Sequence, residues 1–522
     1  MSKKYSEGLI DLILSMSKAE KRNFRLFSTR NSNKDELKFL LLFDYIERVA
    51  SYDDERFLQK HPQIKKQQLS NIKSHLYKQI LTSMRQLAVG NFNEMEIRER
   101  MDFSQILQNK GFTELALKQL EKGFDLAQKG GHNILALEIT EIAKNIETQY
   151  FTRSLVSRVS MLTKRSSSAE KRVSYSVTFS NLFIEVYGLY LKNGYVRDEA
   201  EYLSAKRFLN ARMVHYVPNE LGFEEKNNLY SAMVWYHLIV QDFVMNYKYA
   251  KLWLDLFDEN PVYKQTRPEL YLKAQNNYLI ALHNLRNYKR FDGALNRFVN
   301  ERSLYRNNEG ITLIYDFYYY SNIVNRYYLE GRFSDGLEVV PEILQFIKVN
   351  GDKLDDHRIM NLYYKVACMY FGAGDNRKTI FYLNFVFQFG SNTLRDDIQS
   401  FARILNLIAH FELGNEDLLE SQIKSVYRYL IKKEEMRGVQ KEIILFLRNM
   451  PYNTRGSLKR AFIDLHQRLT ELTKDRFEKR AFLYLDIIAW LECKLEGKSV
   501  QEMVRQKFLE EQKTGNKLYF PR

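Results

Sequence analysis

Apolar side chains recur along most of the chain with the spacing of an α-helix. Between residues 66 and 87 every third or fourth position is apolar and most positions between them are polar. The apolar members are Leu69, Ile72, Leu76, Ile80, Met84 and Leu87. This spacing predicts one long amphipathic helix. Ser17 and Glu20 have the spacing of a helix capping box. No stretch alternates with period two for long enough to predict a sheet, so we expect an all-α fold.

A short turn sequence recurs between these apolar stretches. It lies at residues 193–195, 290–292, 330–333, 374–376 and 414–416, and the last four turns are about 40 residues apart. Aligning the last four units on the turn brings other residue types into register. These are Tyr278, Tyr320 and Tyr363 in the first helix, Leu285, Tyr327 and Tyr370 before the turn, Ala294 and Gly336 after it, and then Phe298, Val340, Leu383 and Ile423. Such internal repetition predicts a stack of similar helix pairs.

The register resembles the tetratricopeptide repeat, in which large and small residues at fixed positions pack neighbouring helices together. The stretch from Asn246 to Pro261, with Ala250, Leu254 and Phe257 between them, is similar to half of such a repeat. The units here are longer than the usual tetratricopeptide length of about 34 residues. The resemblance implies a right-handed α-solenoid of antiparallel helix pairs with helical N- and C-terminal caps.

We expect three regions along the chain. Residues 1–95 lack the turn sequence and are expected to form a basic N-terminal helical domain or cap. Residues 96–435 are expected to hold the tetratricopeptide-like (TPR-like) repeats, and residues 436–522 a C-terminal helical cap, because the open ends of a repeat array need closing. The stretch 485–493 resembles the C-terminal end of uncharacterised bacterial proteins of this repeat type, which implies no function.

The composition agrees with a helical protein. Seven prolines and 22 glycines are few for 522 residues, and 45% of the residues are hydrophobic. The two cysteines, Cys368 and Cys493, cannot form a disulfide framework and indicate reduced thiols in a cytoplasmic protein. The longest apolar runs are far shorter than the roughly 20 residues that a membrane span needs, so we expect no membrane span.

No sequence pattern indicates a catalytic site or a metal site, so we expect no enzymatic activity, no cofactor and no metal. The Gly-Lys-Ser at 497–499 lacks the earlier glycine of a phosphate-binding loop and is expected to end one helix and cap the next. The Asp-Asp-His at 355–357 is expected to lie at a helix N-terminus, where acidic residues are favourable. An enzyme would need a cleft that brings Asp355 or His357 together with other acid–base groups.

The chain carries a net charge of +15, and three segments hold most of the excess: 56–93, 153–172 and 448–460. These segments could bind an acidic polymer such as DNA or RNA, or could be ordinary solvated surfaces. The polyanion candidates are Lys65, Lys66, Lys73, Lys78, Arg85, Arg455, Lys459 and Arg460. On the helical wheel Lys66 and Lys73 lie beside the apolar stripe, away from Lys78 and Arg85, so the charges form no single stripe.

The tetratricopeptide resemblance also implies a concave groove that is lined by the first helix of each pair. Its candidate residues are Asn276, His283, Arg286, Tyr318, Ser321, Asn325, Tyr328, Asn361, Tyr364 and Cys368. Asparagine and tyrosine suit a peptide, because amides pair with its backbone and rigid aromatic rings pack at low entropy cost. The alternative is that the tyrosines only fill gaps between repeats. In the next unit Phe401, Ile404, Ile408 and Phe411 indicate either core or an apolar docking patch.

These observations predict a non-enzymatic scaffold or adaptor that binds a protein or peptide partner in the concave face. The alternative is a nucleic-acid-associated or regulatory protein whose basic N-terminal helices contact phosphate.

Overall fold

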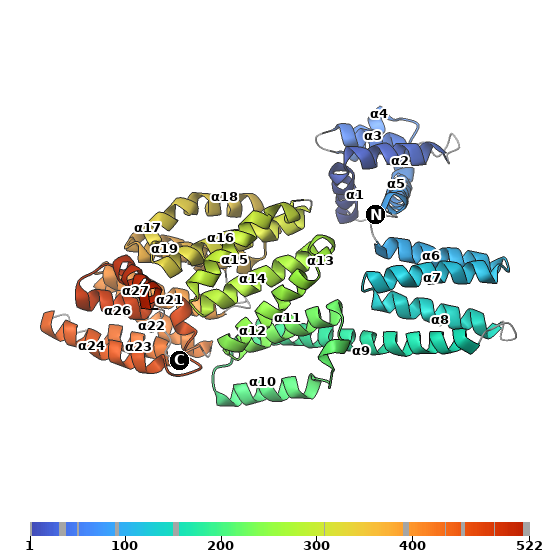
Figure 1. Ribbon diagram of the computed structural model, residues 1–522. Coiled ribbons are helices and arrows are strands. Elements are labelled where there is room, and N and C mark those ends of the chain that lie inside the picture. Colours follow the sequence, from blue (N-terminus) through green and yellow to red (C-terminus); the bar gives the residue numbers. More distant parts are fainter. Residues whose placement is uncertain are drawn as a thin grey trace. The chain divides into compact units, whose positions relative to one another are not determined.

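The described part of the chain is built from helices alone. The computed structural model describes residues 3–30, 38–49, 52–88, 93–149, 156–306, 308–389, 396–433, 435–449, 455–484 and 486–514. Within these ranges the chain forms α-helices and short 3₁₀ turns, and no β-strand (Figure 1). The predicted all-α class is therefore confirmed for these residues.

The chain divides into two compact units, residues Met1–Ser174 and Tyr175–Arg522. The first unit holds eight helices and the start of a ninth, α9, which contains the boundary. They are α1 (Lys3–Ser15), α2 (Lys18–Arg30), α3 (Lys38–Arg48), α4 (Asp54–Lys60), α5 (Lys66–Ala88), α6 (Asn93–Asn109), α7 (Thr113–Lys129), α8 (Asn133–Gln149) and α9 (Val156–Asn193). This division differs from the three predicted regions, because the first repeat-like helices pack within the first unit.

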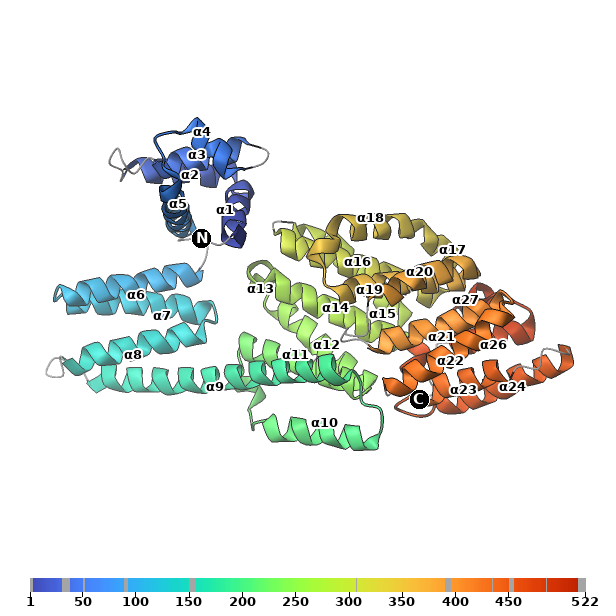
Figure 2. The same ribbon diagram turned by 180° about the vertical axis from the view of Figure 1, so that it is seen from behind.

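The second unit contains the rest of α9 and the remaining helices, packed in successive pairs (Figure 2). They are α10 (Glu199–Arg212), α11 (Phe223–Ile239), α12 (Phe243–Glu259), α13 (Val262–Thr266), α14 (Pro268–Asn284), α15 (Tyr288–Asn300), α16 (Glu309–Glu330), α17 (Phe333–Gly336), α18 (Val340–Asn350), α19 (Asp356–Gly372), α20 (Asn376–Gln388), α21 (Asp396–Glu412), α22 (Glu416–Lys432), α23 (Gly438–Arg448), α24 (Arg455–Leu472), α25 (Ala481–Tyr484), α26 (Ile487–Glu496) and α27 (Val500–Thr514). Short 3₁₀ turns lie at Pro218–Glu220, Glu301–Tyr305, Leu337–Val339 and Gly351–Lys353.

The predicted helix at 66–87 is observed as α5. Its apolar stripe faces the core of the first unit, although its last member, Leu87, is exposed. The capping box before α2 is also observed, because the Ser17 amide donates to Glu20 Oε2 at 2.7 Å and the Glu20 amide donates to Ser17 Oγ at 3.2 Å. These two features depend on neighbours within one or two helical turns, which is why the local sequence predicts them.

Most of the predicted turns lie where the pattern places them. Gly331, Gly374 and Gly414 each have a positive φ (63°, 85° and 68°), a backbone conformation that glycine adopts without steric cost. The turn predicted at 290–292 is wrong, because these residues lie inside α15. The chain turns earlier, where Arg286 has a φ of 49° and the Asn287 side chain caps α15. The pattern misses this turn because no glycine marks it.

Large and small residues in the predicted register do pack neighbouring helices closely. Phe298, Val340, Leu383 and Ile423, which share one repeat position, are all buried. At Gly336 a Cβ atom would lie 1.8 Å from Met369 Cε and 2.9 Å from the Tyr327 ring. A larger residue there would force α17 away from α16 and α19.

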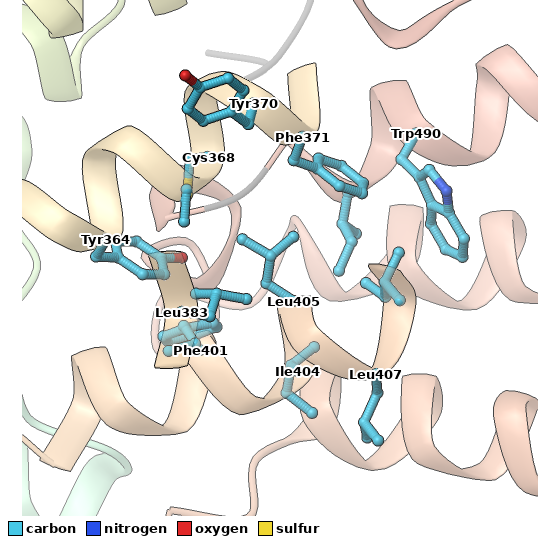
Figure 3. Close-up of a cluster of buried hydrophobic side chains, with 14 of the residues drawn as sticks. Tyr364, Cys368, Tyr370, Phe371, Leu383, Phe401, Ile404, Leu405, Leu407 and Trp490 are labelled. Carbon is cyan, nitrogen blue, oxygen red and sulfur yellow. The ribbon is translucent and has the colours of Figure 1, made fainter. Parts of the chain in front are cut away.

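The last helices share a core with those before them. One cluster of buried side chains runs from Val324 to Val504, so the described helices α23 to α27 pack as a continuation of the preceding helix pairs. Phe401 and Ile404 are part of this core (Figure 3), as is Ile408. The Phe411 ring packs 6.3 Å from that of Trp490. This group is therefore core and not an exposed docking patch.

Candidate ligand-binding cavity

The second unit contains a cavity of about 950 Å³ that is lined by residues of α9, α11, α14, α16 and α19. Apart from Cys368, nine groove residues are predicted, and they lie in α14, α16, α19 and the turn after α14. Eight of these nine line the cavity: Asn276, His283, Tyr318, Ser321, Asn325, Tyr328, Asn361 and Tyr364. The ninth, Arg286, lines a smaller pocket of about 60 Å³ together with Cys368. The two pockets share His283 and Tyr328 among their lining residues.

Helical spacing brings these residues together. On α16 the lining residues Tyr318, Ser321, Asn325 and Tyr328 are three or four positions apart and so share one face. Corresponding faces of α14 and α19 contribute the other side chains. Because several helices each present one such face, a short pattern repeated in the sequence builds one continuous wall.

A chain of amide side chains links the three helices along this wall. The Asn322 Nδ2 group of α16 donates to Asn276 Oδ1 of α14 at 2.9 Å and to the Tyr318 carbonyl oxygen at 2.8 Å. The Asn325 Nδ2 group donates to Asn322 Oδ1 at 3.5 Å. The Lys365 ammonium of α19 donates to Asn325 Oδ1. These contacts join the polar groups of three helices into one hydrogen-bonded row.

Lys365 and the Tyr318 carbonyl oxygen determine which way every amide in this row points. An ammonium can only donate, so the Asn325 atom beside it must be oxygen and its nitrogen must face Asn322. The Tyr318 carbonyl can only accept, so the Asn322 atom beside it must be nitrogen. The two constraints agree with each other. As a result Asn276 accepts a hydrogen bond at its Oδ1 atom, and its NH₂ group can still donate to a ligand.

Lys365 is enclosed by protein but partly exposed to the cavity. Its ammonium lies 5.8 Å from the centre of the Tyr328 ring, and no carboxylate of the described residues forms an ion pair with it. Burial lowers the pKa of Lys365 to about 8, because a low-dielectric surrounding disfavours the charged form. A cation held without a counter-charge is unusual in a protein interior.

The other titratable groups around Lys365 are held neutral. Burial, followed by the positive charges of Lys365 and Arg286, lowers the pKa of His283 to about 3. Burial raises the pKa of Cys368 to about 11 and raises the pKa of Tyr328 and of Tyr364 well above the usual tyrosine value. At neutral pH Lys365 is therefore mostly protonated, and the side chains of His283, Tyr328, Tyr364 and Cys368 near it are neutral.

Ser321 adds an unsatisfied polar atom to the same wall. Its side chain is buried, and its hydroxyl oxygen has no hydrogen-bond partner among the described residues. A buried hydroxyl without a partner costs about 1–3 kcal/mol. A ligand in the cavity could recover this free energy by donating to Ser321 or accepting from it.

Aromatic rings from α9 and α11 also line the cavity. The Trp235 ring lies 4.9 Å from that of Tyr187 and 4.8 Å from that of Tyr190. The Arg480 guanidinium lies over the Tyr195 ring, 3.0 Å from its centre, and pairs with Asp397. The repeat pattern does not indicate this aromatic group, nor Asn322 and Lys365, because the pattern covers only fixed positions on one helix of each pair.

A different set of tyrosines lies between neighbouring helices. Tyr278, Tyr320 and Tyr363, which share a repeat position, pack against aromatic rings of neighbouring helices, with ring centres 5.8, 5.3 and 4.9 Å from their partners. They fill gaps between helices. Tyrosines on the other face of the same helices line the cavity.

The acidic residues expected at a helix N-terminus are observed there, at the edge of the cavity. The Asp355 carboxylate caps α19 by accepting from the Arg358 amide at 2.9 Å, and it also pairs with the Arg358 guanidinium. The expected helix end at Gly497 is observed as well, with a φ of 71°, and Ser499 caps α27. The structure gives neither segment a phosphate-binding loop.

The polyanion candidates differ in their surroundings. Lys65, Lys66, Lys78, Lys459 and Arg460 are exposed. Arg85 is exposed and pairs with Asp102 at 2.9 Å, whereas the side chain of Arg455 lies outside the described residues. Lys73 is buried, and its ammonium pairs with Asp54 at 2.6 Å. Lys73 is therefore a structural residue in this conformation. This corrects the prediction that Lys73 is a polyanion contact.

In the described ranges, no group of three or more His, Cys, Asp and Glu side chains is placed to hold a metal ion. None of the described helices is both long and apolar enough to cross a membrane. No protein-family model matches the chain, and no curated protein is detectably similar to it.

Proposed function

We propose that the second unit is the binding module of a non-enzymatic scaffold or adaptor, and that it holds an extended peptide or a protein segment in the cavity. The observation that supports this proposal is the convergence of eight groove residues on one cavity of about 950 Å³. A cavity of this size is large enough for a few residues of an extended chain.

The lining has the chemistry that a peptide needs. Amide groups of Asn276 and Asn325 and the hydroxyl of Ser321 can pair with backbone N–H and C=O groups. The rings of Tyr187, Tyr190 and Trp235 offer flat apolar surface for side chains. The paired helices would then form a TPR-like solenoid with its concave side at the cavity. We also propose a cytoplasmic location, since both cysteines are buried free thiols.

A peptide selection tests the proposal. The full chain is immobilised and offered a pool of randomised decapeptides, and the bound sequences are identified by mass spectrometry. The same selection is run with the double variant Tyr318→Ala/Asn325→Ala, which alters the cavity, and with Lys432→Ala/Lys441→Ala, which alters an exposed surface of the same unit.

We expect the wild-type chain and the surface variant to enrich the same peptides and the cavity variant to lose them. Circular dichroism and thermal unfolding establish that the cavity variant is folded. The proposal is wrong if the wild-type chain enriches no peptide, or if a folded cavity variant enriches the same peptides equally well.

A further inference from the structure

The cations that line the two pockets fall into two kinds. Arg480 pairs with Asp397, Arg358 pairs with Asp355, and Arg286 lies 3.7 Å from Asp486. Lys365 differs, because its ammonium contacts an amide oxygen and forms no ion pair with a carboxylate of the described residues. An ammonium has three N–H donors, and the Asn325 oxygen accepts only one.

The amide row extends this donor character along the wall. Because Lys365 and the Tyr318 carbonyl orient the row, Asn276 exposes its NH₂ group and Asn325 keeps a second N–H. The wall therefore presents a positive charge followed by neutral hydrogen-bond donors. A group that complements it must carry a negative charge and further acceptor oxygens.

We propose that Lys365 binds a carboxylate of the peptide that occupies the cavity, and that the amide row binds the acceptor oxygens next to that carboxylate. This inference rests on the proposed function and specifies its ligand as an acidic peptide. The carboxylate belongs either to the carboxyl terminus of the peptide or to an Asp or Glu side chain.

The surroundings favour a single carboxylate over a more highly charged group. One ammonium and neutral amides can balance a monoanion, whereas a phosphate backbone is usually held by several arginines or lysines. Asp355 and Asp356 lie at the same cavity and disfavour a polyanion through repulsion. Binding a carboxylate also gives Lys365 the counter-charge that its position lacks.

Three defined probes test this inference. Each is a pool of N-acetylated randomised decapeptides: the first is amidated and contains no Asp or Glu, the second is amidated and contains both, and the third lacks both but has a free carboxyl terminus. The full-length chain is compared with Lys365→Met, with Lys365→Arg and with Lys441→Met, an exposed control in the same unit. The amount of each pool that binds is measured by mass spectrometry.

We expect wild type to bind the second or the third pool at least about tenfold better than the first, since a hydrogen-bonded ion pair accounts for about tenfold to a hundredfold in affinity. The pool that is preferred identifies the source of the carboxylate. Lys365→Met should lose the preference, whereas Lys365→Arg and Lys441→Met should keep it.

Thermal unfolding separates binding from folding. Lys365→Met should unfold at a temperature no lower than wild type, because it removes a charge that has no internal counter-charge. The inference is wrong if the neutral pool binds as well as the others, or if folded Lys365→Met keeps the preference; in both cases the peptide-binding function stands. Binding of none of the three pools by wild type would overturn that function as well.

Discussion

Two lysines, one in each unit, differ in the groups that contact their ammonium ions away from bulk water. Lys73 of α5 is buried, with an ammonium 2.6 Å from the Asp54 carboxylate and 5.0 Å from the centre of the Tyr52 ring. Lys365 of α19 also lies near a tyrosine ring, but it contacts only the neutral amide of Asn325 and faces a cavity. Both ammonium groups lie near a tyrosine ring, but of the two only that of Lys73 has a carboxylate as its counter-charge.

This difference separates a structural charge from a binding charge. The carboxylate of Asp54 satisfies Lys73, so Lys73 stabilises the contact between α4 and α5 and has little capacity for a ligand. Lys365 keeps donors free at a place where a ligand can reach them. Sites built for binding often retain such an unsatisfied group at a cost in stability.

The largest expected effect comes from giving Lys365 an internal counter-charge. Asn325→Asp places a carboxylate where the amide oxygen already accepts from Lys365. The new ion pair should compete with the ligand and lower the affinity for carboxylate-containing peptides by about 2 kcal/mol, or roughly thirtyfold. Fluorescence anisotropy with a labelled peptide from the selection measures this loss.

The matched control is Asn284→Asp, which adds the same charge to the cavity lining, whereas the hydrogen bond of the Lys365 ammonium goes to Asn325. A similar loss of affinity in both variants would mean that general repulsion, and not pairing with Lys365, is responsible.

The reverse change removes the counter-charge from Lys73. Asp54→Asn should destabilise the contact between α4 and α5 by about 1–2 kcal/mol, because it leaves a buried ammonium without its carboxylate. The value is below that of a fully buried pair, since the Asp54 side chain is 52% exposed. Hydrogen exchange of the α5 amides should be faster in this variant. The control is Glu420→Gln, in an exposed pair with Lys424, which should leave the exchange rate of the α5 amides unchanged. Unaltered exchange in Asp54→Asn would show that Lys73 does not depend on its partner.

A smaller effect is expected from pH. Lys365 has a lowered pKa of about 8, and only its protonated form attracts a carboxylate. Raising the pH from 7 to 9 should therefore weaken binding of the acidic peptide by about tenfold. His283, with a pKa of about 3, and Cys368, with a pKa of about 11, keep one charge state over this range. The titration is measured by anisotropy, with Lys365→Met as the comparison. A pH dependence of the same size in that variant would assign it to another group.

The smallest effect concerns the exposed lysines of the first unit. Lys65, Lys66 and Lys78 are in water, so each should contribute little and only at low salt. We expect weak retention on mixed-sequence DNA that falls in the triple variant Lys65→Ala/Lys66→Ala/Lys78→Ala and does not change in Lys73→Met. Strong retention of wild type at physiological salt would instead favour the nucleic-acid alternative.

Much of the local structure follows from the sequence. The period of apolar residues predicts α5, the Ser17–Glu20 spacing predicts the cap of α2, and glycines predict the turns at Gly331, Gly374 and Gly414. Each of these depends on residues a few positions apart, whose geometry is set by the helix itself. The groove residues were predicted differently, from the tetratricopeptide resemblance, which implies a concave groove lined by the first helix of each pair.

The tertiary structure decides what the charges do. Lys73 and Lys365 both lie on amphipathic helices, and nothing in their flanking residues reveals that one meets Asp54 and the other a row of asparagines. That outcome depends on how separate helices pack, because the counter-charge comes from another element of the fold. The sequence by itself determines an all-α chain of similar helix pairs and which faces turn inward; only packing decides which buried cation is satisfied and which is left facing a cavity.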